Sequence, residues 1–128
     1  MKVFLRVVGL LLIFPLMLFG MSSKYGITVI GEGPSSISFL LGEGKKGAEV
    51  NTFLVVKRND VGQWDYKHPV WSFELSPGSS MSLKRVTYGD VPFGYSETTK
   101  AAALESGTQY LAVSTAPGSG GSVEFVVH

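Results

Sequence analysis

The sequence predicts an all-β protein, a two-layered sandwich of seven short strands, and three observations support this fold. From Tyr25 onward, apolar residues recur at every second position in short runs. Gly, Pro, Ser and Asp cluster between those runs, as expected for turns. No segment after residue 22 shows the pattern of a long amphipathic helix. Strands of this kind are apolar on one face, so two sheets must pack together to bury those faces.

Seven runs carry the alternation, and each is bounded by turn-forming residues. In order, they are marked by Ile27 and Val29; Ile37, Phe39 and Leu41; residues 50–57; Trp71, Phe73 and Leu75; Met81, Leu83, Val86 and Tyr88; Tyr110, Ala112 and Ser114; and Val123, Phe125 and Val127. Turns are predicted at residues 31–34, 42–47 and 76–78. The Gly/Ser-rich residues 117–122 lie between the last two runs and predict a hairpin loop.

Three segments depart from simple alternation. Residues 50–57 are almost continuously apolar, which predicts a central strand covered on both faces. Within residues 81–88 the apolar positions change parity near Lys84 and Arg85, which predicts a β-bulge that reverses the two faces. Residues 98–105 contain three consecutive alanines and favour either a short helix or a short edge strand, because eight residues are marginal for an isolated helix.

The first 22 residues have the layout of a signal peptide. Lys2 and Arg6 bracket a short positive start, and an uncharged apolar stretch follows as far as Phe19. Small residues at Gly20 and Ser22 predict cleavage near Ser22. The alternative is an uncleaved N-terminal anchor, although the apolar stretch is shorter than the roughly 20 residues that span a bilayer. Either way, residues 23–128 are expected to form one exported domain, periplasmic or secreted, or held at the inner membrane by residues 1–22.

Composition narrows the classes of partner and the means of stabilisation. The chain has no cysteine, so an exported domain of this size must fold without disulfides, by burial of its core. Of the 11 basic residues, 9 remain once Lys2 and Arg6 are set aside, against 10 acidic ones. This balance provides no basic surface for nucleic acid, and no nucleic-acid partner is expected. Contact with a membrane is expected only through residues 1–22, if they are retained.

One short segment carries a resemblance to a known class of domain. Residues 104–110 place Leu104 six positions before Tyr110, which resembles the tyrosine corner of fibronectin type III and related immunoglobulin-like domains. Ser106 stands where proline is common in that motif. The region from Trp71 to Phe125 is also similar to small uncharacterised bacterial envelope proteins. The resemblance implies an immunoglobulin-like or fibronectin-like β-sandwich and a hydrogen bond from the Tyr110 hydroxyl to main chain, but no activity.

Motifs for catalysis or metal binding are weak. His68 is the only histidine besides the terminal His128, and it lies in a polar turn before Pro69. Ser-His-Asp chemistry would depend on His68, and no Gly-x-Ser-x-Gly motif accompanies it. A clustered set of metal ligands is also missing from the sequence pattern. We therefore expect a protein that is not an enzyme, without cofactor or metal, and keep a hydrolase as the least favoured alternative.

Four aromatic residues are the best candidates for contact with a partner. Trp64 and Tyr66 lie in a polar loop without strand alternation, and Phe93 and Tyr95 lie in a second loop. Loops at the end of a sandwich are where such scaffolds place recognition, and rings with a polar atom give large contact areas at low entropic cost. The structural alternative is that these rings fold back and cap the core.

These observations predict a small, exported, non-catalytic module of the cell envelope that binds a protein partner through these loops or through an exposed sheet edge. The alternative is a carbohydrate-binding module that stacks its loop aromatics on sugar rings. A polysaccharide-binding surface requires at least two exposed, coplanar rings about one sugar repeat apart. The geometry of the two aromatic loops therefore distinguishes the two interpretations.

Overall fold

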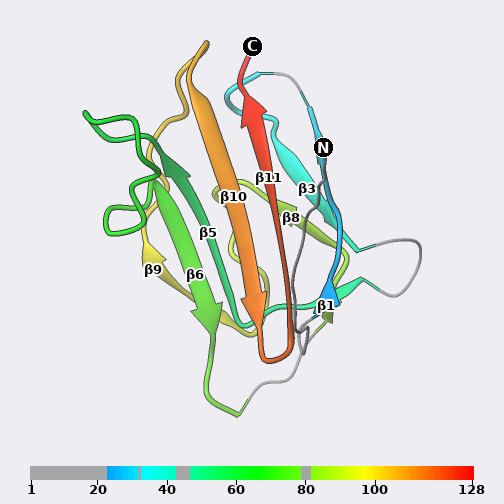
Figure 1. Ribbon diagram of the computed structural model, residues 1–128. Helices are drawn as coiled ribbons and strands as arrows, with labels where there is room; N and C mark the ends of the chain where they lie inside the picture. Colours follow the sequence, from blue (N-terminus) through cyan, green and yellow to red (C-terminus); the bar gives the residue numbers. More distant parts are fainter. Residues whose placement is uncertain (1–22, 32, 43–46, 79–81) are drawn as a thin grey trace, which may run out of the picture.

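The computed structural model describes residues 23–31, 33–42, 47–78 and 82–128, and within these ranges the chain is all β, without a helix (Figure 1). The predicted signal peptide, residues 1–22, and Met81 lie outside the described residues. The strands are β1 (Ser23–Lys24), β2 (Ile27–Ile30), β3 (Ser38–Leu41), β4 (Ala48–Glu49), β5 (Thr52–Lys57), β6 (Trp71–Leu75), β7 (Ser82–Leu83), β8 (Arg85–Thr87), β9 (Tyr95–Thr99), β10 (Gln109–Ala116) and β11 (Ser119–Val126).

The strands form three sheets. A six-stranded sheet has the order β1-β11-β10-β5-β6-β9, a three-stranded sheet the order β2-β3-β8, and β4 pairs with β7. All pairings are antiparallel except that of β1 with β11, which is parallel. β5 pairs with β10 on one side and β6 on the other, which confirms the central position predicted for residues 50–57.

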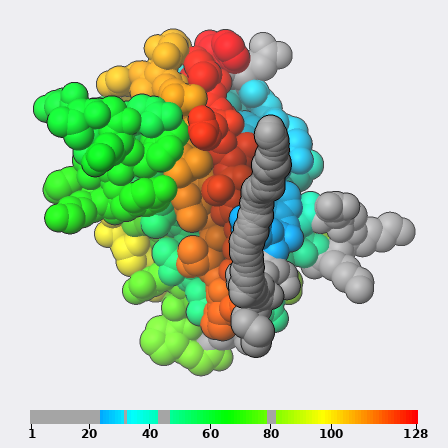
Figure 2. All heavy atoms as spheres, in the orientation of Figure 1, coloured from blue at the N-terminus to red at the C-terminus, as the bar shows by residue number. Residues whose placement is uncertain are grey.

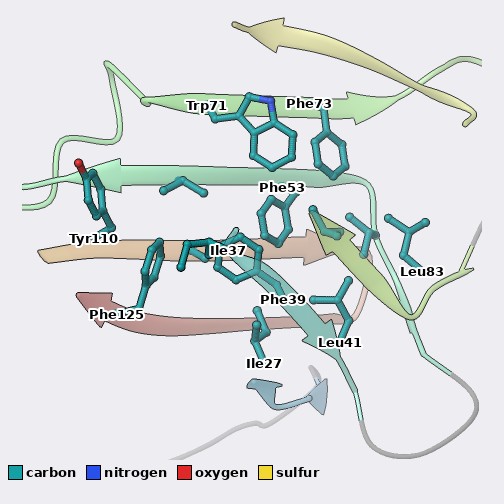
Figure 3. Close-up of a cluster of buried hydrophobic side chains, with 14 of the residues drawn as sticks. Ile27, Ile37, Phe39, Leu41, Phe53, Trp71, Phe73, Leu83, Tyr110 and Phe125 are labelled. Carbon is teal, nitrogen blue, oxygen red and sulfur yellow. The ribbon is translucent and has the colours of Figure 1, made fainter. Parts of the chain in front are cut away.

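Phe39 joins the two larger sheets at the centre of the core. Its ring centroid lies 5.3 Å from that of Phe53 on β5 and 5.3 Å from that of Phe125 on β11 (Figure 3). Phe73 stacks on Phe53 at 5.4 Å, and Tyr110 stacks on Phe125 at 5.6 Å. All five rings are buried. The predicted alternation is confirmed, because the apolar side of each sheet faces the other across one aromatic core, as in a β-sandwich.

The change of parity near Lys84 is confirmed, but the predicted β-bulge is wrong, because a break between two strands of different sheets produces it. Leu83 is buried in the β4–β7 pair, and Val86, three residues later, is buried in the β2-β3-β8 sheet. Between them the strand breaks at Lys84, whose carbonyl accepts a hydrogen bond of 2.9 Å from the Leu41 amide. The odd spacing of the two apolar residues therefore marks the point at which the chain leaves one sheet and enters another.

The prediction of seven strands is wrong, because the described residues contain eleven. Three of these strands, β1, β4 and β7, have only two residues each, which is too short to show an alternation of apolar residues. The sequence does not predict β9, because this strand lies at the edge of the larger sheet. Its residues are mostly polar and exposed, so no apolar alternation marks it. Of residues 98–105, Thr98 and Thr99 belong to this edge strand and the rest is irregular, so the helical alternative is wrong.

Tyrosine hydroxyl groups tie together segments that are distant in sequence. The Tyr95 hydroxyl donates to the Val50 carbonyl at 2.6 Å, and the Tyr88 hydroxyl donates to the Ala102 carbonyl at 2.6 Å. Tyr25 bonds to the hydroxyl of Ser114, 89 positions away. The Tyr110 hydroxyl accepts the Glu105 amide at 2.8 Å, which gives the main-chain contact implied by the tyrosine-corner resemblance. Core burial is therefore supplemented by polar cross-links in this chain without disulfides.

The chain is expected to lose stability steeply in alkali, because burial raises the pKa of Tyr88 to about 12; the neighbouring Tyr110 adds to this rise and the hydrogen bond to Ala102 opposes it. In an unfolded chain this phenol ionises with its ordinary pKa of 10.0. Between pH 10 and 12 the folded protein thus holds a proton that the unfolded chain has lost, so unfolding becomes more favourable as the pH rises.

Urea unfolding measured at pH 8, 10 and 11.5 checks this expectation. The denaturation midpoint should be unchanged up to about pH 9 and fall progressively above pH 10. The same decrease in Tyr88→Phe, which cannot ionise at this position, would show that other groups are responsible.

Candidate functional site

The loop of residues 58–69 connects β5 to β6 and is built around Asn59. The Asn59 side-chain oxygen accepts the amides of Val61 and Gln63, each at 3.0 Å. The Asn59 amide in turn donates to the Gln63 carbonyl at 2.7 Å, and Gly62 adopts φ +83° to complete the turn. The first part of the loop is therefore a closed hairpin with a defined shape. Figure 2 shows the loop, in green, projecting from one side of the molecule.

Within this hairpin, Arg58 and Trp64 face each other as a bridged antiparallel pair. The guanidinium carbon lies 4.0 Å from the centroid of the Trp64 ring, a cation–π contact. Arg58 Nη1 donates to the Gly62 carbonyl at 2.9 Å and Nε donates to Gln109 Oε1 on β10 at 3.2 Å. Gln109 Nε2 continues to Glu124 Oε1 on β11 at 2.9 Å. This polar row, Trp64, Arg58, Gln109 and Glu124, fastens the loop to the outer side of the sheet.

The second half of the loop carries Tyr66 and His68. Tyr66 is 56% exposed, so a partner can reach its ring. His68 Nδ1 lies 3.2 Å from Asp65 Oδ1, and the His68 side chain is 81% exposed. In the part of the chain that the structure describes, no serine hydroxyl is hydrogen-bonded to this imidazole. The pair Asp65 and His68 therefore lacks the third group that Ser-His-Asp catalysis requires.

The structure does not bring the two predicted aromatic loops together. Trp71, at the start of β6, follows the 58–69 loop, whereas Leu75, at its end, pairs with Tyr95. Trp64 and Tyr66 therefore lie at one end of β6, while Phe93 and Tyr95 lie at the other, about 13 Å away along the strand.

Tyr95 is not available to a partner, which corrects its prediction as a contact residue. It is only 8% exposed, its ring packs against Phe73 at 5.1 Å, and its hydroxyl is bonded to Val50. It is the first residue of β9 rather than a loop residue. Its loop neighbour Phe93 is 91% exposed and stands apart from the other candidates. Trp64, which is half-buried, and Tyr66, which is exposed, remain as the predicted residues of one loop.

Sequence reasoning missed the residues that position Trp64. Asn59 and Gly62 are residue types that favour tight turns, so together they indicate a hairpin in which Arg58 pairs with Trp64. Gln109 and Glu124 carry no local signal, because their contact with this loop depends on the order of β5, β10 and β11 in the sheet.

A shallow pocket of about 400 Å³ lies elsewhere, where β1 meets β10 and β11. Its lining is rich in small and hydroxyl-bearing residues, which are Lys24, Tyr25, Val113, Ser114, Thr115, Ser119, Gly120, Gly121 and Ser122. Ser114 is its buried polar residue, and the hydroxyl is already bonded to Tyr25. Within the described ranges, no buried side-chain nitrogen or oxygen is left without a partner, in this pocket or outside it.

Neither the remaining structural features nor the comparisons with known proteins assign a function to the chain. Among residues 23–31, 33–42, 47–78 and 82–128, no group of three or more His, Cys, Asp or Glu side chains is arranged to hold a metal ion. The same residues contain no helix of the length and apolarity needed to cross a membrane. The chain matches no protein-family model, no curated protein and no solved structure. The site must be interpreted from its own geometry.

Proposed function

We propose that the chain is a small, exported, non-catalytic binding module of the cell envelope, which contacts a protein partner through the 58–69 loop. The observation that carries this proposal is the presence of Arg58, Trp64 and Tyr66 on one loop, with Arg58 packed on the Trp64 ring. Trp, Tyr and Arg are the residue types enriched at the energetic centres of protein interfaces. Export, to the periplasm or beyond the cell, or retention at the inner membrane through residues 1–22, is part of the same proposal.

The order of the loop supports a binding role. Internal hydrogen bonds from Asn59 and the contact of Arg58 with Trp64 hold the hairpin before any partner arrives. A surface that is already ordered loses less conformational entropy on binding, so more of the contact energy appears as affinity. The guanidinium that packs on the Trp64 ring places an arginine beside the indole, a combination of residue types enriched at the centres of protein interfaces.

For the fold, we propose an immunoglobulin-like or fibronectin-like sandwich. The order β11-β10-β5-β6 corresponds to strands G, F, C and C′ of such domains, and β2-β3-β8 corresponds to A, B and E. Tyr110 then lies near the start of strand F, where these domains place the tyrosine corner. β1 and β9 are additions at the two edges of the larger sheet.

Site-specific photo-crosslinking in the producing cell tests the binding surface. A benzophenone side chain in place of Tyr66 is expected to give one adduct of discrete mass. Trp64→Ala in the same chain should abolish it, because truncation of a central aromatic at an interface weakens binding by at least about thirtyfold. A benzophenone in place of Phe93 is the matched control, since this ring is exposed at the other end of β6.

The remaining outcomes contradict the proposal in different ways. If Tyr66 gives no adduct, or if the Phe93 position gives the same adduct, the 58–69 loop is not the contact surface. If the adduct is a heterogeneous species that periodate degrades, the partner is a polysaccharide and the carbohydrate-binding alternative is correct.

A further inference from the structure

We infer that Arg58 receives a carboxylate, so that the partner of the 58–69 loop presents an acidic side chain there. This inference rests on the proposed binding function and names the chemistry that the loop recognises. It follows from three properties of the Arg58 guanidinium, namely its unused donors, the lack of an acidic neighbour and its fixed orientation.

The first property is the set of hydrogen-bond donors that remain. A guanidinium has five N–H donors. Nε donates to Gln109 and Nη1 donates once to the Gly62 carbonyl, which leaves one N–H on Nη1 and two on Nη2. These two nitrogens form the end-on fork that matches the two oxygens of a carboxylate. Arg58 is exposed, so that fork can be reached from solvent.

The second property is the absence of charge neutralisation within the described part of the chain. There, no carboxylate oxygen lies within 4.0 Å of a guanidinium nitrogen of Arg58. Two acidic residues of this region have other partners: Asp65 pairs with His68, and Glu124 accepts from Gln109. Asp60 in the turn is exposed and forms no ion pair with Arg58. An acidic group from a partner therefore meets a cation that has no competing ion pair.

The third property is orientation. The Trp64 ring at 4.0 Å, the Gly62 carbonyl and the Gln109 side chain hold the guanidinium from three sides. A long cationic side chain normally loses rotamer freedom when it forms an ion pair, which is why exposed pairs contribute little. That entropy has already been lost at Arg58, so a carboxylate gains more from this cation than from a free surface lysine.

Nuclear magnetic resonance of the full chain in detergent micelles tests the inference with an acetylated hexaglutamate peptide as probe. The chain has two tryptophans, so its spectrum has two indole N–H signals. The Trp64 signal should shift saturably with added peptide. The Trp71 signal should stay in place, because this ring is buried and its Nε1 donates to Glu97 at 2.9 Å. Trp71 also reports whether each variant is folded.

Variants at Arg58 identify the cation. Arg58→Gln should weaken the response of the Trp64 indole about three- to tenfold, and Arg58→Lys should restore part of it, since lysine keeps the charge but lacks the fork. Arg85→Gln is the matched control, because Arg85 is also exposed but lies on β8 in the other sheet. It should leave the response unchanged.

Three results would overturn the inference: no shift of the Trp64 indole with hexaglutamate, an equal shift in Arg58→Gln, or the same shift with hexalysine. Crosslinking separates this failure from failure of the proposed function. If the adduct from the Tyr66 position persists in Arg58→Gln but is lost in Trp64→Ala, the binding surface stands and the carboxylate assignment is wrong.

Discussion

Replacement of Phe39 by alanine is expected to lower the free energy of unfolding by about 3–5 kcal/mol. Phe39 is fully buried and contacts Phe53 on one strand and Phe125 on another. Its removal leaves a cavity at the position where the two larger sheets meet. Both sheets are fixed by their own hydrogen bonds, so the cavity cannot close by a small movement.

The chain provides a matched control in Phe93. Phe93→Ala removes the same atoms from a side chain that is 91% exposed, so its effect should stay within about 0.5 kcal/mol. Urea denaturation followed by tryptophan fluorescence measures both variants on the same scale. Similar midpoints for the two would show that Phe39 is not at the centre of the core.

A valine at Gly121 is expected to cost about 1–3 kcal/mol, because it removes the space in which β1 docks. A Cβ atom at Gly121 would lie 2.6 Å from the Tyr25 carbonyl oxygen and 3.1 Å from its ring. Valine is otherwise favourable in strands, so the destabilisation reports this clash alone. The Tyr25 amide, which donates to Gly120 at 3.1 Å, should also exchange its hydrogen faster.

Gly26→Val is the comparison for that substitution. Nothing lies within 4 Å of a Cβ atom built at Gly26, so a valine there should leave stability and amide exchange almost unchanged. If Gly121→Val is as stable as Gly26→Val and keeps the Tyr25 amide protected, β1 does not occupy the place beside β11 that the structure gives it.

Much of the fold could be predicted from the alternation of apolar residues. Phe53, Phe73, Tyr110 and Phe125 follow a period of two and all face the core, since burial on one side of a sheet determines that pattern. The parity change at Lys84 was as informative, because a one-residue offset moves every later side chain to the other face. Two-residue strands and the polar edge strand β9 carry no such signal, so their number could not be predicted.

The candidate site could be predicted only in part. Aromatic residues in a polar loop singled out Trp64 and Tyr66, but the same argument also selected Tyr95, which is buried. Local sequence does not show whether a ring lies before or within a strand, and Tyr95 begins one. The link from Arg58 to Gln109 joins residues 51 positions apart, so it depends on strand order and not on any local pattern.

The tyrosine cross-links allow the domain to fold in either redox environment. Thioredoxin and glutathione act on sulfur, and the bonds from Tyr95 to Val50 and from Tyr25 to Ser114 contain none. The domain can therefore reach the same native state in a reducing cytoplasm as in an oxidising compartment, without an oxidase or a disulfide isomerase. The export that we propose would therefore place no demand on thiol chemistry.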